Sequence, residues 1–465
     1  MAVSIPPLPH ALAAEAPWVF AAGCFVLAPT ALVGATGWLH RPARAGGPGF
    51  DVRAATVDVV IPVCRNQSTI VLCLAGLHAQ TLRPRRIRLV EDCSGARDGT
   101  AVLAREFAQA NGFRIEVVEQ HEPGGRAASL AAQAELLDGD VMVVLDADTV
   151  IDSPDYLERC VHALYEGAGV AGACGARLPL RGSDRRRWAM SDAFRRWLGG
   201  DRWRDPLVPR NGVQCFSRWL AERHGECVGL VQQRFVHRGQ LRAFGGICHP
   251  CGAVAYRRRY LAALSHQYLA SDDEARSACD EDLLLGFALA HEGFRTVQVP
   301  EVIARVHSAQ GVTAVPRARL QYTRAFLEAG RRFRALLRMP RRAPLAEPAH
   351  GCERRRHAEP FRQPFGARFT HARGRPMGWA FACTALDKAL LPLAVVVAVA
   401  AGFGSWLAWI ALVELGVWLA VLAAVASGPR WRTLGCGLLV APLRYVEMAA
   451  DAVAVAGFLG TRRRG

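Results

Sequence analysis

Two hydrophobic periods alternate along the first two thirds of the chain. Short apolar or β-branched runs, which are typical of buried strands, lie at residues 57–63, 87–90, 114–118 and 141–145. Segments of helical periodicity lie at residues 68–80, 99–110 and 127–137. This alternation predicts an α/β domain with a mostly parallel, doubly wound sheet, which we place at residues 51–335. Ligands of such sheets bind beyond the carboxyl ends of the strands, which directs attention to residues 62–66, 91–94 and 146–148.

Longer apolar segments at both ends of the chain predict membrane helices. Residues 17–39 carry no charge and, at 1.5 Å per residue, are long enough to cross a hydrocarbon core of ~30 Å. A signal peptide is the alternative, but the residues before this segment lack a basic region. Two further spans are predicted at residues 380–403 and 406–427. Arginines follow the first span, so the positive-inside rule predicts a multi-pass protein of the cell (inner) membrane with a cytoplasmic α/β domain.

The last apolar segment, residues 433–459, allows two interpretations. Arg444, Glu447 and Asp451 interrupt it at spacings of three and four, which places them on one face of a helix. An amphipathic helix at the membrane interface fits this pattern, and a third C-terminal span lining a polar pathway is the alternative.

The distribution of basic residues indicates that they bind a membrane surface. The formal net charge is +16, and thirteen arginines fall between Arg331 and Arg375, directly before the C-terminal apolar segments. We interpret residues 336–376 as an Arg- and Pro-rich interfacial linker. This placement argues against a nucleic-acid partner, which requires basic and aromatic residues interleaved on one exposed face. The fourteen scattered cysteines indicate reduced thiols.

The strongest chemical pattern is the pair Asp146 and Asp148, directly after the apolar run 141–145. Two carboxylates at positions i and i+2 beyond a strand can face one hard cation together. Mg²⁺ or Mn²⁺ prefers such oxygen ligands and leaves positions for substrate phosphates. A turn with two solvated acids is the structural alternative.

Two further acidic positions are candidates for a site. Asp92 follows the run 87–90 and could accept a hydrogen bond from a nucleobase, although a helix-capping or turn aspartate is the better explanation of this residue taken alone. Glu281 and Asp282 open an apolar helical segment, where acids stabilise the helix dipole. A carboxylate at that position could also deprotonate a sugar hydroxyl.

In combination, these patterns resemble glycosyltransferase family 2, whose fold is named GT-A. Its motifs are matched in order by residues 59–63 (VVIPV), 90–94 (VEDCS), 98–100 (DGT), 124–130 (GGRAASL), 145–148 (LDAD, a DXD motif), 281–282 (ED), 293–295 (GFR) and 299–301 (VPE). The resemblance implies that Pro62, Asp92, Arg126 and Asp146 bind a nucleotide-sugar donor. It further implies that Asp146 and Asp148 hold the metal and the diphosphate, and that Asp282 is the catalytic base of inverting transfer.

A weaker motif concerns the acceptor. The membrane-bound synthases of cellulose, chitin, hyaluronan and alginate carry Q-x-x-R-W before their C-terminal spans. Gln321 and Arg324 match it, although a polar amphipathic helix explains them equally well. Ala325 replaces the Trp, which argues against polymerisation. The resemblance places Glu281, Gln321 and Arg324 on the acceptor or product side.

The sequence therefore predicts a membrane-anchored enzyme that transfers a sugar from a nucleotide diphosphate sugar, expected to be UDP-linked, to a polysaccharide or lipid. Two alternatives stay open. One is a non-processive transferase that forms a glycolipid, and the other is a degenerate, non-catalytic subunit.

Overall fold

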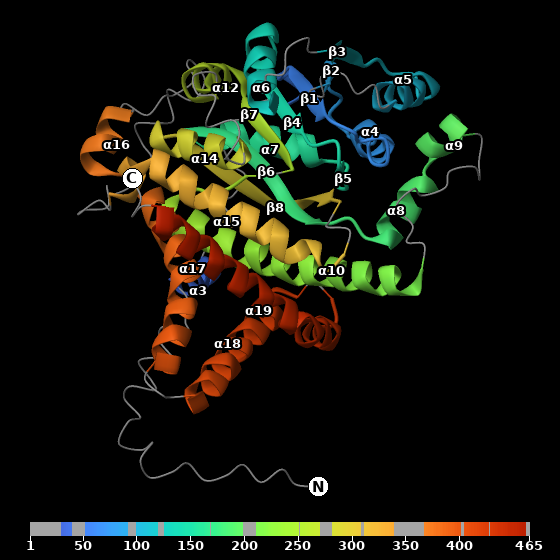
Figure 1. The fold of residues 1–465 in the computed structure, drawn as a ribbon. Coiled ribbons are helices and arrows are strands. Elements are labelled where there is room, and N and C mark those ends of the chain that lie inside the picture. The colour runs from blue at the N-terminus through green and yellow to red at the C-terminus, as the bar shows by residue number, and fades with distance from the viewer. Residues whose placement is uncertain are drawn as a thin grey trace.

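The computed structural model describes most of the chain, and every structural statement below concerns the described part. That part comprises residues 29–39, 52–91, 99–119, 125–167, 169–198, 211–250, 252–269, 281–307, 311–338, 367–400, 404–426 and 428–461. A body built on a sheet occupies one end of the molecule, and helices α17 (Met377–Ala400) and α18 (Gly404–Val425) project from it (Figure 1). Helices α10 (Gly212–Val231), α15 (Ala314–Arg332) and α19 (Arg430–Thr461) lie between the two parts.

Eight strands form a single mixed sheet in the order β3-β2-β1-β4-β7-β6-β8-β5. Their bounds are β1 (Val57–Val63), β2 (Arg86–Glu91), β3 (Glu116–Glu119), β4 (Val141–Leu145), β5 (Thr149–Ile151), β6 (Val170–Pro179), β7 (Ala253–Arg257) and β8 (Arg295–Val306). The first four strands are parallel, and β6 is parallel to β8. The predicted mostly parallel sheet is thus only half right, because β7 is antiparallel to both β4 and β6, and β5 is antiparallel to β8.

Both faces of the sheet are covered, as the wholly apolar strands predict. Successive residues of β1 point to opposite faces: Val59 and Ile61 join one buried core, and Val60 joins the other. The first core also contains α4 (Ile70–His78), α5 (Thr100–Ala110) and α7 (Tyr156–Glu166). The second contains α6 (Gly125–Leu136), α12 (Arg258–Leu264) and α14 (Glu281–His291). The predicted helices and strands up to β4 are confirmed, with ends that differ by a few residues.

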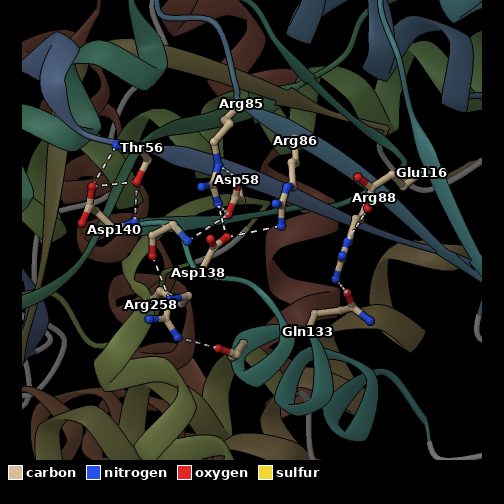
Figure 2. Close-up of polar contacts among 12 residues, drawn as sticks. Thr56, Asp58, Arg85, Arg86, Arg88, Glu116, Gln133, Asp138, Asp140 and Arg258 are labelled. Carbon is tan, nitrogen blue, oxygen red and sulfur yellow. Dashed lines mark hydrogen bonds and ion pairs between the residues drawn. The ribbon is translucent and has the colours of Figure 1, made fainter.

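Ion pairs and hydrogen bonds join the amino ends of the parallel strands, at the end of the sheet opposite to Asp146 and Asp148. The buried carboxylate of Asp58 accepts hydrogen bonds from Arg85 Nε at 3.1 Å, Arg85 Nη2 at 2.7 Å and the Gly139 amide at 3.1 Å (Figure 2). Asp140, which directly precedes β4, accepts from the Thr56 amide at 2.9 Å and from its hydroxyl at 2.7 Å. These contacts hold the start of β4 beside the start of β1 and so help to fix the position of β4 in the sheet.

Helices between the sheet and the projecting pair form a second layer. The segment between β6 and β7 contains α8 (Gly182–Ala189), α9 (Asp192–Leu198), α10, a π-helical stretch (Gln232–Val236) and α11 (His237–Phe244). The short helix α3 (Pro29–Thr36) packs on α11 and α17, with Gly34 against the ring of Phe235. The predicted span 17–39 is therefore described only in its last part, since residues 17–28 lie outside the described residues.

Two helical segments, Met377–Val396 and Leu407–Val425, are long and apolar enough to cross a bilayer. They correspond to the predicted spans 380–403 and 406–427. Of the predicted linker, residues 339–366 lie outside the described residues, while Ala367–Arg373 forms helix α16. Whether these segments cross a membrane stays a prediction.

Helix α19 turns its polar residues toward the rest of the protein. Arg444 forms an ion pair with Glu414 of α18, Glu447 lies 3.4 Å from His224 Nε2 of α10, and Asp451 contacts α15. The sequence correctly predicts that Arg444, Glu447 and Asp451 share one face. The interfacial helix predicted there would present such a face to water, and in the structure the face packs on protein instead.

One buried histidine is expected to make the stability of this layer depend on pH. Burial and the nearby His249 together lower the pKa of His237 to about 4, although the hydrogen bond to Gln298 (3.2 Å) opposes the shift. An unfolded imidazole binds a proton near pH 6.5, whereas the folded one stays neutral. Stability is therefore complete above pH 6.5 and falls by about 3 kcal/mol as the pH drops toward 4. Thermal midpoints of the wild type and of His237→Gln at pH 7 and pH 4.5 would test this, because the variant should lose part of the pH dependence.

Candidate functional site

The two aspartates of the DXD motif lie at the carboxyl end of the central strand β4. The Asp146 amide donates to the Gly252 carbonyl at 2.9 Å, and the His307 amide donates to the Asp148 carbonyl at 2.9 Å. These bonds clamp the segment between the start of β7 and the end of β8. Ala147 between them is buried, whereas both aspartates are half-buried, so the two carboxylates lie on the more open side of the segment.

Arg126 joins residues from three distant parts of the sequence. Its Nη2 lies 2.5 Å from Asp146 Oδ1 and 3.3 Å from Asp282 Oδ1. Arg126 belongs to the first turn of α6, and Asp282 to the first turn of α14. Both helices thus begin beside the end of β4, so two of the predicted donor residues, Arg126 and Asp146, form one cluster with the predicted catalytic base.

The electrostatics of this cluster favour a bound cation. Burial raises the pKa of Asp146, Asp282 and Asp148 raise it further, and Arg126 and Arg177 lower it. Burial also raises the pKa of Asp148, with Arg177 and the Thr149 hydroxyl (3.3 Å from Oδ1) opposing the shift. Three carboxylates thus crowd together with incomplete compensation by arginine. A divalent cation would lower these pKa values and stabilise the ionised acids.

Asp146 and Asp148 suit an Mg²⁺ or Mn²⁺ ion whose other ligands are oxygens of the substrate. No group of three or more His, Cys, Asp or Glu side chains suited to hold a metal occurs within the described ranges. A cage made of protein alone is therefore absent there. Asp146 and Asp148 supply hard oxygen ligands, and Mg²⁺ is commonly bound by one or two carboxylates together with substrate phosphates.

The remaining predicted residues are placed less closely. Pro62 lies in β1 opposite Val90 of β2, near the carboxyl ends of both strands. Asp92 lies outside the described residues, and of Glu281 only the backbone, at the start of α14, is described. Gln321 and Arg324 are exposed on α15, and the structure records no contact between them and the acids. Their assignment to the acceptor side stays a prediction.

Three residues that the sequence did not single out belong to the site. Arg177 of β6 acts electrostatically on both aspartates of the DXD motif, and Tyr256 of β7 is buried near Asp282 and Arg126. His307 directly follows β8 and contacts Asp148 through its backbone. The position of His307 at the end of an apolar strand could have indicated a site residue from the sequence alone. Arg177 could not be singled out in this way, because it is one of 56 arginines.

The loop after β1 shows backbone strain at the same edge of the sheet. Arg65 is exposed and has a φ of +57°, which is uncommon for a residue other than glycine. The side chain of Asn66 accepts a hydrogen bond from the Cys64 amide at 2.7 Å and so holds the turn. Cys64 is disulfide-bonded, which departs from the predicted reduced thiols. Eight other described cysteines are free, among them Cys73, whose thiol donates to the Asp146 carbonyl.

Comparisons with known proteins place part of the chain beside one family. Residues 58–229 match the family model of Glycosyl transferase family 2. An N-acetylglucosaminyltransferase of Azorhizobium caulinodans is 28% identical over 273 residues, which cover 58% of this chain and 59% of that protein. An undecaprenyl-phosphate 4-deoxy-4-formamido-L-arabinose transferase of Aeromonas hydrophila is 30% identical over 119 residues, or 25% of this chain and 36% of that protein.

Among solved structures, a mannosyltransferase of Pyrobaculum calidifontis in complex with GDP-Man and Mn²⁺ aligns with a TM-score of 0.48 and 17% identity. That alignment covers 94% of this chain and 99% of that one. The chain spans about three fifths of the length of the first curated relatives it matches. Residues 58–229 of the chain are thus similar to the domain of glycosyltransferase family 2.

Proposed function

We propose that the protein is a membrane-anchored, inverting glycosyltransferase that uses a nucleotide diphosphate sugar. The observation that carries this proposal is the single cluster formed by Asp146, Asp148, Arg126 and Asp282 beyond β4. It combines acids suited to a metal, a cation suited to phosphate, and a carboxylate suited to accept a proton. Ligand sites lie at this edge in α/β sheets.

The donor half of the reaction is assigned to the DXD motif and Arg126. Asp146 and Asp148 would hold Mg²⁺ or Mn²⁺, which when bound stabilises the negative charge of the leaving diphosphate. Arg126 bridges two carboxylates in the described structure, and its fixed fork of donors suits a phosphate equally well. Arg177, Pro62 and Asp92 complete the proposed donor site.

The acceptor half is assigned to Asp282. Its carboxylate would remove the proton of the acceptor hydroxyl, whose oxygen then attacks the anomeric carbon opposite the leaving diphosphate. Displacement from the opposite face inverts the configuration at that carbon. The proton ends on Asp282, and the nucleoside diphosphate leaves.

Membrane attachment is assigned to α17, α18 and the predicted N-terminal segment. The length and apolar composition of the first two support this, as do the thirteen arginines before them, which suit the anionic cytoplasmic surface. The positive-inside rule then places the catalytic domain in the cytoplasm at the cell (inner) membrane. Helix α19 lies at this junction, with its polar face packed on α10, α15 and α18.

We propose a lipid acceptor in preference to a growing polysaccharide. The missing Trp of the Q-x-x-R-W motif and the exposure of Gln321 and Arg324 both disfavour a polymer channel beside α15. The relatives are named an N-acetylglucosaminyltransferase and an undecaprenyl-phosphate 4-deoxy-4-formamido-L-arabinose transferase, which suggests N-acetylglucosamine and undecaprenyl phosphate as first substrates to test. Because the donor is expected to be UDP-linked, UDP-N-acetylglucosamine is the first donor to test. A non-catalytic subunit is disfavoured because the three acids are kept together.

The direct test is nucleotide release from a panel of UDP- and GDP-sugars by the full chain in nanodiscs, with Mn²⁺, Mg²⁺ or EDTA. We expect metal-dependent release with one sugar nucleotide and a single glycolipid product. A ladder of long chains would favour polymerisation instead. Absence of release with every donor and both metals would support the non-catalytic subunit.

The catalytic base is tested by Asp282→Asn. Loss of general-base catalysis is expected to slow transfer by about 10²- to 10⁴-fold, because a side-chain amide cannot take the proton. Metal-dependent donor binding, measured by calorimetry, should stay within about threefold of wild type, since the DXD motif is intact. Transfer at the wild-type rate would show that another residue is the base.

A further inference from the structure

A separate apolar cavity lies where the catalytic domain meets the C-terminal helices. It has a volume of about 210 Å³ and lies between α14, α15, α17 and α19. Phenylalanines from all four helices line it: Phe287, Phe326, Phe381 and Phe458. None of the residues assigned above to the donor, the metal or the catalytic base lines this cavity.

The walls of the cavity suit a hydrocarbon chain better than a polar ligand. The rings of Phe287 and Phe381 lie 3.9 Å apart between centroids, and those of Phe287 and Phe326 lie 5.8 Å apart. A Cβ added at Gly330 would meet no atom within 4 Å, so this part of the wall is open space. Apolar cavities of this kind bind hydrocarbons in preference to water.

The rim of the cavity carries positive charge on its exposed side. Arg331 and Arg334 are both exposed and both line the opening. Arg331 is paired with Glu328: its Nε and Nη2 donate hydrogen bonds to Glu328 Oε1 at 2.9 Å and 2.5 Å. Within the described part of the chain, Arg334 forms no ion pair and is available to an anion.

We propose that this cavity binds the alkyl chain of a single-chain lipid phosphate from the bilayer, with the phosphate on Arg334 and Arg331. The charge of the rim matches a phosphate, and the apolar walls match the chain. The proposal rests on the membrane position proposed above, which brings the cavity to the depth of the lipid headgroups. Phe287 follows Asp282 by five residues, or about 7.5 Å along α14, so a bound chain would steady the helix that carries the base.

The test uses the full chain in phosphatidylcholine nanodiscs and a dodecyl phosphate with a photoreactive group at the chain end. We expect saturable labelling of the segments around Phe326 and Phe381. Dodecyl phosphate should compete for the site, dodecanol should compete about tenfold more weakly, and inorganic phosphate should not compete. Dodecanol competing as well as dodecyl phosphate would overturn the role of the arginines.

Variants of the cavity provide the controls. Gly330→Leu places a side chain in the open space at a helical position that tolerates it, and should reduce labelling at least about tenfold. Gly416→Leu on α18, where a Cβ also meets no atom within 4 Å, should leave labelling unchanged. Ala385→Leu fills the cavity from α17 and serves as the second filling variant. Unchanged labelling in both filling variants would refute the cavity as the site.

Arg334→Gln separates charge from shape. It should weaken dodecyl phosphate about tenfold while leaving dodecanol unaffected. Metal-dependent release of nucleotide is measured on the same samples. Saturable labelling without nucleotide release would support the lipid site and contradict the proposed catalysis. Nucleotide release without saturable labelling would support the catalysis and contradict the lipid site.

Discussion

Asp148→Asn is expected to lower sugar transfer by at least about 10³-fold and to remove metal-dependent donor binding, with the fold preserved. The amide keeps the shape of the carboxylate but not its charge, so the cation loses one of the two acids assigned to it. Asp148 is half-buried, and burial raises the pKa of both Asp148 and Asp146, so the removal of one charge should not unfold the protein. Transfer and Mn²⁺-dependent donor binding would be measured in nanodiscs.

Asp140→Asn is the matched control for this prediction. Asp140 directly precedes β4, and Asp148 lies just beyond its other end, so both changes remove one charge near the same strand. An asparagine at 140 can still accept from Thr56, and transfer should remain within about threefold of wild type. Full transfer by Asp148→Asn across several divalent ions would contradict the metal assignment.

Asp451→Ala is expected to have the largest effect on stability, a loss of about 3–5 kcal/mol. Asp451 lies 2.7 Å from Arg319 Nη2 and 3.2 Å from Lys388 Nζ, and Lys388 also donates to the Thr323 hydroxyl at 2.7 Å. The side chains of Lys388 and Asp451 are only 3% and 6% exposed. Removal of the shared acid leaves two cations at the junction of α15, α17 and α19 without their counter-ion.

Detergent-induced unfolding followed by circular dichroism would measure this loss. Arg159→Ala breaks an exposed ion pair with Asp155 on α7 and should cost less than about 1 kcal/mol. Replacing Lys388 by Met in the Asp451→Ala background should recover part of the stability, because one unpaired charge disappears. Equal stability of Asp451→Ala and wild type would show that water reaches the cluster.

Much of the catalytic half of the fold could be predicted from hydrophobic pattern alone. The runs that became β1 and β4 are apolar along nearly their whole length, which indicated strands covered on both faces. The direction of β7 could not be predicted, because its pattern is the same for a parallel and an antiparallel strand. Its direction depends on the course of the helical segment between β6 and β7. The spacing of apolar residues predicts single helices and strands but not that course.

The candidate site was predicted in its residues rather than in its geometry. Asp146, Asp148 and Asp282 each had an ordinary structural explanation, as turn or helix-capping acids. Their meeting depends on α14 beginning beside β4, a contact between segments more than 130 residues apart. The face of α19 shows the opposite limit: spacing predicted the shared face of Arg444 and Asp451, but only tertiary packing decides whether that face meets water or protein.

The buried position of Lys388 has a practical consequence, because it is the only lysine in the chain. An amine-specific acylating reagent would find no accessible ε-amino group in the folded junction described here. Acylation at position 388 would therefore report directly on separation of the projecting helices from the catalytic body. Lys388, as the only ε-amino group, is thus a chemical probe of how the two halves come apart once its acylation is told apart from that of the α-amino group.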